Sequence, residues 1–255
     1  PALGGTCLNV GCIPSKALLQ SSENYHEVLH DFAEHGITVG DVKFDAAKMV
    51  ARKDEIVTKL TGGIAYLFKK NKIESIFGKG SFKGQNGELW QIEVDNKGEK
   101  SLIEAKHVIV ATGSSPRPLP LVEIDNKNVL DNEGALNLTE VPKKLGVIGS
   151  GVIGLEMGSV GKRVGSDVTV LEAFKIFTKE QGLTIELGVA IKEIKNGVKG
   201  VSVSYEVAGK AKTETFDKLI VAIGRVPNTD GLNAEAVGLV KDERGFITVN
   251  DLCQT

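Results

Sequence analysis

The sequence predicts an α/β protein made of two doubly wound domains with parallel sheets, the first of them incomplete. Two glycine-rich segments, residues 4–16 and 149–154, each lead into a helical pattern. From about residue 145 onward strands and helices alternate, which favours a parallel sheet with right-handed crossovers. A proline-rich stretch at 115–120 separates the two regions. We therefore expect one domain over residues 1–120, a second over 121–246, and a return to the first over 247–255.

The composition is that of an ordinary globular protein. Of 255 residues, 41% are hydrophobic and 25% charged, which is enough to bury a sizeable core. The net charge of −2 comes from 31 cationic and 33 anionic residues. This balance gives no electrostatic footprint for nucleic acid or an anionic membrane, so we expect neither as a partner. No apolar run approaches the ~20 residues that span a bilayer, and the first residues lack the pattern of a signal peptide.

Apolar spacing predicts the helices. One should begin near Pro14 and stop at Gly36, a second should run from an N-cap at Asp45 to Lys70, and a third should cover 152–164. Strands are expected over 73–77, 89–94, 101–105, 107–113, 145–148, 167–172, 184–187, 198–207 and 218–223. The run 107–113 has the pattern of a fully buried strand.

The connection over residues 173–183 is short for its place between two parallel strands. A right-handed crossover takes at least ~10–12 residues including its helix. We therefore expect residues to be absent from the sequence between about 174 and 178.

The first glycine-rich segment carries two cysteines, Cys7 and Cys12, at the entry to a helix. A disulfide needs α-carbons ~4.4–6.8 Å apart, so the loop must fold back on itself, and Gly11 supplies the freedom to do so. The partial positive charge of a helix N-terminus lowers a thiol pKa and favours the reactive thiolate. Lys16 follows Cys12 by one turn, so both can face one side of the helix, where Lys16 has a hypothetical role at a cofactor.

Two other interpretations of the cysteine pair remain open: a buried, inert pair and half of a zinc site. Zinc needs further Cys or His ligands at matched spacing, and only Cys253 remains, with no histidine near the loop. His26 and His30 are four residues apart on a helix but have no evident third ligand. We expect them on a solvated helix face and expect no metal.

The second glycine-rich segment reads Gly149, Ser150, Gly151, Val152, Ile153, Gly154. It follows a strand and opens a helix, and Glu172 ends the next strand about 20 residues on, as in a Rossmann dinucleotide site. The pyrophosphate would meet the helix N-terminus. An acidic residue at the position of Glu172 bonds the ribose hydroxyls and repels a 2′-phosphate, which favours NAD over NADP. A glycine-rich turn without a ligand is the alternative.

Glu156 is expected in the first turn of the helix that follows. A carboxylate there is stabilised by the helix dipole, whatever its function.

Residues 4–19, 111–114, 149–156 and 222–229 together resemble the pyridine nucleotide–disulfide oxidoreductases. Residues 4–19, Gly-Gly-Thr-Cys-Leu-Asn-Val-Gly-Cys-Ile-Pro-Ser-Lys-Ala-Leu-Leu, look like the dihydrolipoamide dehydrogenase branch of that family. The resemblance covers essentially the whole chain and implies two Rossmann-like domains, one for FAD and one for NAD.

The resemblance implies a flavoprotein that oxidises protein-bound dihydrolipoamide to lipoamide, with NAD⁺ as acceptor. Cys7 matches the interchange thiol and Cys12 the thiol beside the flavin, as a redox disulfide. Lys16 and Glu156 match an ion pair near the flavin, and all four match catalytic positions. The cofactor-binding positions are Gly4, Gly5, Thr6, Lys16, Gly80, Thr112, Gly113 and Ser114, then Gly149, Ser150, Gly151, Val152, Ile153, Gly154 and Glu156, and finally Glu172, Ile191 and Gly224.

The resemblance also implies a homodimer, a lipoyl-bearing acyltransferase of a 2-oxo acid dehydrogenase complex as partner, and a bacterial cytoplasmic or mitochondrial matrix location. The family's first FAD fingerprint would precede Pro1. Its second FAD motif and its interface domain, with a catalytic His–Glu pair, would follow Thr255. Gly161 stands where the family often has a large aromatic residue. A mercuric or glutathione-type reductase and a non-catalytic NAD-binding fragment are the alternatives.

Overall fold

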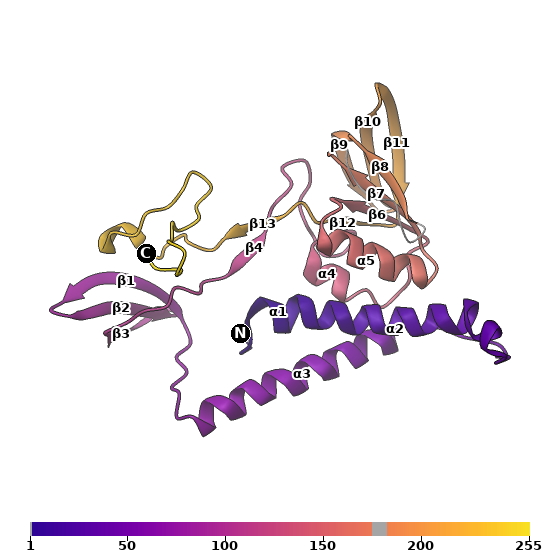
Figure 1. Ribbon diagram of the computed structural model, residues 1–255. Helices are drawn as coiled ribbons and strands as arrows, with labels where there is room; N and C mark the ends of the chain where they lie inside the picture. The colour runs from indigo at the N-terminus through magenta and orange to yellow at the C-terminus, as the bar shows by residue number, and fades with distance from the viewer. Residues whose placement is uncertain (1, 175–182) are drawn as a thin grey trace. The chain divides into compact units, whose positions relative to one another are not determined.

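The computed structural model describes residues 2–174 and 183–255, which form two compact units. The smaller unit combines the residues up to Leu3 with Ile64–Ser115 and Arg225–Thr255. The larger unit combines Gly4–Gly63 with Pro116–Gly224. Figure 1 shows the order of the helices and strands along the chain. Each unit is described by itself.

The larger unit is built on a five-stranded parallel sheet with the order β5-β12-β6-β7-β8. The strands are β5 (Val129–Leu130), β6 (Lys144–Ile148), β7 (Asp167–Glu172), β8 (Thr184–Leu187) and β12 (Lys218–Val221). Helix α5 (Val152–Arg163) connects β6 to the adjacent parallel strand β7. This is the strand–helix–strand unit that the sequence predicts, and the α/β fold class with a Rossmann-like parallel sheet is confirmed.

The two faces of this sheet are covered differently. On one face Leu145, Val147 and Val168 pack with Met157 of α5 and with residues of α4 (Asn132–Leu136). The other face meets a three-stranded antiparallel sheet of β9 (Ala190–Gly197), β10 (Gly200–Val207) and β11 (Lys210–Phe216). The strand expected at 198–207 therefore belongs to this second sheet, and its neighbours β9 and β11 were not predicted.

The helices of the N-terminal part are α1 (Gly5–Val10), α2 (Cys12–His30), the 3-10 turn η1 (Phe32–His35) and α3 (Ala46–Lys70). The helices predicted at 45–70 and 152–164 are confirmed. The helix predicted from near Pro14 to Gly36 instead begins at Cys12 and ends at His30, and the turn η1 lies between it and Gly36. Gly36 ends η1 at φ 73°, a left-handed conformation that glycine adopts without strain. The Asp45 side chain accepts the backbone N–H of Lys48 at 2.9 Å, which is an N-cap contact.

Helix α3 is attached to the larger unit by polar contacts of its first half. Lys53 is only 4% exposed, and its ammonium donates to Asn137 Oδ1, which follows α4, at 2.7 Å. Arg52 donates to the carbonyl oxygen of Ala17 in α2 at 3.1 Å. The boundary between the two units falls inside α3, between Gly63 and Ile64.

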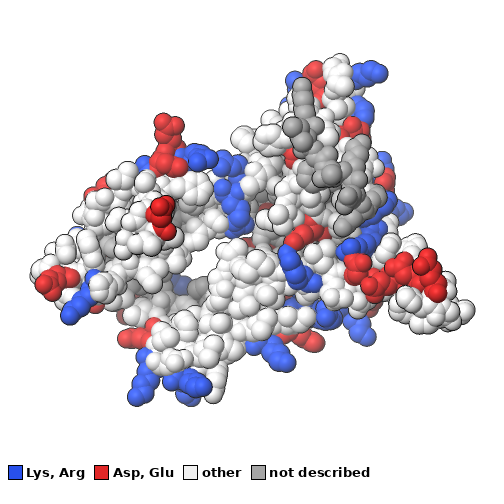
Figure 2. Space-filling view, in the orientation of Figure 1, with Lys and Arg blue, Asp and Glu red and all other residues white. Residues whose placement is uncertain are grey.

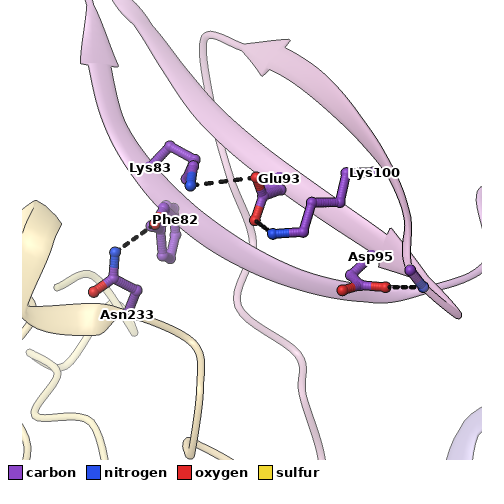
Figure 3. Close-up of polar contacts among 7 residues, drawn as sticks. Phe82, Lys83, Glu93, Asp95, Lys100 and Asn233 are labelled. Carbon is purple, nitrogen blue, oxygen red and sulfur yellow. Dashed lines mark hydrogen bonds and ion pairs between the residues drawn. The ribbon is translucent and has the colours of Figure 1, made fainter.

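The smaller unit contains an antiparallel sheet of β1 (Lys79–Asn86), β2 (Leu89–Asn96) and β3 (Glu99–Ala105). Phe82 packs with Leu232 and with Ala234 of the 3-10 turn η2 (Ala234–Val237). The amide of Asn233 donates to the Phe82 carbonyl at 2.7 Å (Figure 3). The side chain of Asn233, which directly precedes η2, thus satisfies a backbone carbonyl of β1.

Glu93 on β2 is paired with two lysines on the neighbouring strands (Figure 3). Its carboxylate lies 3.1 Å from Lys100 on β3 and 3.2 Å from Lys83 on β1. Hydrogen bonds from Lys100 and then Lys83 hold the pKa of Glu93 below its ordinary value of 4.5. The face seen in Figure 2 carries Lys, Arg, Asp and Glu side by side, without a field of one sign.

Two predicted strands are wrong. Residues 73–77 form no strand, and β1 begins only at Lys79. Residues 107–113 are also irregular, and Ile109 is 92% exposed. An apolar run becomes a buried parallel strand only where neighbours pair with it and helices cover it, and no segment of the described residues pairs with this one.

The expected absence of residues between about 174 and 178 concerns positions that, from 175 on, lie outside the described residues. Among the helices that the structure describes, none combines the length and apolar character that crossing a bilayer takes.

Candidate functional site

The three glycines of the second glycine-rich segment differ in what an added side chain would meet. Gly149 has φ 98°, and a Cβ there would lie 2.5 Å from the carbonyl oxygen of Ala222. A Cβ on Gly154 would overlap the carbonyl oxygen of Gly149. A Cβ on Gly151 would meet nothing within 4 Å. The fold itself therefore requires glycine at 149 and 154, whereas at 151 it leaves open space that would let a pyrophosphate approach the loop backbone.

This open space belongs to a cavity of about 810 Å³ at the carboxyl ends of β6 and β7. Its size falls within the range of small-molecule and cofactor sites. It lies at the N-terminus of α5, where free backbone N–H groups and the helix dipole favour a phosphate. Of the predicted cofactor residues, it brings together Gly149, Ser150, Gly151, Val152, Ile153, Glu172, Ile191 and Gly224.

Several lining residues were missed by the sequence analysis. Leu119 lies in the proline-rich stretch, which in the sequence indicates only a domain boundary, and Leu121 directly follows that stretch. Phe174 lies two residues after Glu172, and Val189 directly precedes β9. Short apolar segments next to strand ends were the only available signal, and such segments do not by themselves indicate a ligand.

Glu172 ends β7 and is 7% exposed. Its Oε2 accepts both the backbone N–H of Ser150 at 2.7 Å and the Ser150 hydroxyl at 2.6 Å. Its Oε1 accepts the backbone N–H of Phe174 at 2.8 Å. Burial alone would raise the pKa of Glu172, but the hydrogen bonds from Phe174 and Ser150 outweigh it and hold the pKa below its ordinary 4.5. The carboxylate at the cavity wall is therefore ionised at neutral pH.

Cys7 lies in α1 and Cys12 is the first residue of α2, and both are exposed free thiols. Between the two helices, a Cβ on Gly11 would lie 3.0 Å from the Cys7 α-carbon, which leaves no room for a side chain at this position. The pKa of Cys12 is raised, chiefly by a hydrogen bond with the Cys7 side chain. The expectation of a lowered thiol pKa is thus wrong for Cys12 in this dithiol form, because the second sulfur opposes ionisation more than Lys16 favours it.

Lys16 and Glu156 form an ion pair that joins α2 to α5. The hydrogen bond to Glu156 holds the pKa of Lys16 above its ordinary 10.5, and both cysteines interact with Lys16 electrostatically. Glu156 lies beyond the first turn of α5, which has no acidic residue. The predicted placement of Glu156 in that first turn is therefore wrong, and its partner is a lysine rather than the helix dipole.

The remaining predicted cofactor residues fall in two places. Gly4, Gly5 and Thr6 lie at the start of α1, where Gly4 has φ 106° and Gly5 φ 66°. In the smaller unit Gly80 lies in β1, opposite Val94.

Residues 112–114 of the smaller unit are held by the segment that follows β12. Asn228 donates its side-chain amide to the Thr112 carbonyl at 3.2 Å and its backbone N–H to the Gly113 carbonyl at 3.0 Å. Arg225 Nε donates to the Ser114 hydroxyl at 2.7 Å. These contacts fix residues 112–114 within their own unit.

The imidazole rings of His26 and His30 lie 4.4 Å apart on α2. Within residues 2–174 and 183–255, no three His, Cys, Asp or Glu side chains gather in a group able to hold a metal ion.

A Rossmann-type nucleotide pocket and a vicinal dithiol at a helix entry, with a lysine–glutamate pair beside it, define a class: nucleotide-dependent thiol–disulfide oxidoreductases. Comparison with known proteins agrees with this class. Residues 2–255 match the pyridine nucleotide-disulphide oxidoreductase family, and the chain belongs to that family.

Individual members of this family are similar to the chain in sequence and in structure. The chain is 56% identical over 269 aligned positions to a dihydrolipoyl dehydrogenase of Cupriavidus necator, covering 99% of this chain and 56% of that protein. It is 44% identical to the mitochondrial dihydrolipoyl dehydrogenase of Pisum sativum, covering 100% of this chain and 54% of that protein. The crystal structure of LpdA from Mycobacterium tuberculosis superposes with a TM-score of 0.86 at 25% identity, over 98% of this chain and 56% of that one. The chain thus spans about half the length of the relatives it matches.

Proposed function

We propose that the protein oxidises protein-bound dihydrolipoamide to lipoamide with NAD⁺ as the final acceptor. The observation that carries the proposal lies within the larger unit. There the Cys7–Cys12 dithiol, the Lys16–Glu156 pair and a nucleotide-sized cavity share helix α5 and the helices packed on it. The names of the relatives from Cupriavidus necator and Pisum sativum support this substrate.

The chain's own part in the thiol chemistry is exchange. With Cys7 and Cys12 joined as a disulfide, a substrate thiolate attacks the Cys7 sulfur, and the Cys12 thiolate leaves. The second substrate thiolate then attacks the mixed disulfide, which releases lipoamide and leaves Cys7 reduced. Two electrons have then passed from the substrate to the enzyme's cysteine pair. The exposure of both cysteines gives a lipoyl group access to them.

Lys16 is positioned to stabilise the Cys12 thiolate that this exchange produces, because its ammonium favours the charged form of that sulfur. Glu156 keeps Lys16 protonated and oriented. We assign to these four residues the catalytic positions. FAD, when bound, would accept the electron pair from the cysteines and pass a hydride to NAD⁺.

The cavity fits an adenine dinucleotide by the chemistry of its wall. Gly151 leaves room for a pyrophosphate at the N-terminus of α5, and Glu172 presents a charged acceptor for the ribose hydroxyls. We assign NAD to this cavity, with Ile191 and Gly224 among the residues that line it. FAD is assigned to Gly4–Thr6, Lys16, Gly80 and Thr112–Ser114. Residues 1–120 and 247–255 would belong to the FAD domain and 121–246 to the NAD domain.

The proposal also covers the oligomeric state, the partner protein and the subcellular location. Within it, the protein is a homodimer that serves the lipoyl-bearing acyltransferase of a 2-oxo acid dehydrogenase complex, in a bacterial cytoplasm or a mitochondrial matrix.

The test uses the full-length protein and follows NADH formation with dihydrolipoamide. We expect Cys7→Ser to abolish this turnover while some flavin reduction by NADH remains, because Cys7 is the sulfur that meets the substrate. Cys253→Ser removes the third cysteine, which is also exposed, and should leave turnover unchanged. Lipoamide turnover retained in Cys7→Ser would refute the proposal, as would a purified protein that retains no yellow flavin.

A further inference from the structure

Ser150 makes an unusual pair of contacts for the second residue of a glycine-rich nucleotide loop. It is 8% exposed, and both its backbone N–H and its hydroxyl donate to one and the same oxygen, Oε2 of Glu172, at 2.7 and 2.6 Å. The other oxygen, Oε1, is held by the N–H of Phe174 at 2.8 Å. Both Ser150 and Glu172 line the nucleotide cavity.

These contacts remove the rotational freedom of the carboxylate. Hydrogen bonds to a charged acceptor are about twice as strong as those between neutral groups, and here they reach both oxygens. The other donors, the N–H groups of Ser150, Ala173 and Phe174, belong to the backbone. The Ser150 hydroxyl is the donor among these four that depends on the amino acid at its position.

A fixed carboxylate discriminates between nucleotides more sharply than a mobile one. It accepts hydrogen bonds from a ribose that bears free hydroxyls, and it repels the extra charge of a 2′-phosphate at contact distance. A carboxylate free to turn away from the cavity would relieve that repulsion and would also lose the bonds to the ribose.

We propose that the Ser150 hydroxyl is a specificity-determining group, which fixes the Glu172 carboxylate at the cavity wall and so sets the preference for NADH over NADPH. This inference rests on the proposed function, since it assumes that a nicotinamide nucleotide binds this cavity. Ser150 is a positioning residue in this scheme, because it acts through Glu172.

The experiment measures the dissociation constants of NADH and NADPH for the full-length protein by titration calorimetry. We expect Ser150→Ala to reduce the ratio of the two constants by about tenfold, the effect of losing one hydrogen bond to a charged group. Ser150→Thr keeps a hydroxyl and should restore the preference. Ser150→Gly is a second way to remove the hydroxyl, should the alanine variant fold poorly.

Ser166→Ala is the matched control. Ser166 is 2% exposed and its hydroxyl donates to the Pro142 carbonyl at 2.7 Å, so it is a buried, bonded serine of the same unit that does not line the cavity. It should leave the preference unchanged. A wild-type preference in Ser150→Ala would overturn this inference alone. If the wild-type protein bound neither nucleotide, the proposed function would fall first, and this inference with it.

Discussion

Two glycines at the start of α5, Gly151 and Gly154, allow nucleotide binding and folding stability to be tested separately, because an alanine at each should affect only one of the two. In Gly154→Ala the new Cβ overlaps the carbonyl oxygen of Gly149 and lies 3.1 Å from Val147 Cγ1. A backbone oxygen cannot rotate away as a side chain can, so the cost should be that of overpacking, about 1–3 kcal/mol. The better helix propensity of alanine returns about 1 kcal/mol of this. We expect a net loss of up to about 2 kcal/mol in the free energy of unfolding.

Gly151→Ala should behave in the opposite way. Gly151 has φ −68°, which alanine adopts without strain, and the new Cβ has no neighbour within 4 Å. Stability should therefore change by less than about 0.5 kcal/mol. The methyl group would, however, occupy the space through which a pyrophosphate approaches the backbone, so NADH affinity should fall at least tenfold.

Urea unfolding and calorimetric titration with NADH, both on the full-length protein, give the two readouts. Wild-type NADH affinity in Gly151→Ala would refute the assignment of the open space to the nucleotide. An undiminished stability of Gly154→Ala would show that the loop can move away from the new methyl group.

Three further outcomes follow from the electrostatics. In Cys7→Ala the largest cause that raises the Cys12 pKa is gone, so the pH midpoint of Cys12 alkylation by iodoacetamide should fall; an unchanged midpoint would contradict the thiol contact. Glu172 has a lowered pKa, so it contributes stability above pH 4.5 that is lost as the pH falls through its folded pKa; acid unfolding of Glu172→Gln should lack this component, and identical pH profiles of the two proteins would argue against it. Asp125 has a pKa of about 2, so its contribution should persist down to about pH 4 and disappear toward pH 2; Asp125→Asn should abolish that step in thermal scans, and a step that remains would belong to another group.

The sequence-based predictions were right where interactions between neighbouring residues decide the structure. Asp45 caps α3 and Gly36 ends η1 because capping depends on a few neighbouring atoms. The second glycine-rich segment was recognisable because the backbone at Gly149 and Gly154 tolerates no side chain. Glu172 was recognisable because it ends the strand that follows the loop.

The sequence-based predictions were wrong where residues distant in the chain decide the structure. The apolar run 107–113 has the composition of a buried strand, but strand formation requires partners, and those come from elsewhere in a chain. The pKa of Cys12 was misjudged because a helix N-terminus was weighed without the second sulfur beside it. The pattern around Glu156 indicated only the helix dipole, and its pairing with Lys16, 140 residues away, was implied by the family resemblance alone.

By itself, then, the sequence determined the local elements: the capped helices, the strand–helix–strand unit, the paired cysteines and the glycine pattern that marks a nucleotide loop. These depend on interactions within a few residues, which a single sequence displays. The family resemblance implied the Lys16–Glu156 pair, whereas only the tertiary structure decided that β9 to β11 cover the second face of the parallel sheet and that Ser150 holds Glu172. Such contacts join residues that are remote along the chain. A polar side chain can bond to any suitable partner, and only the fold decides which partner comes within bonding distance.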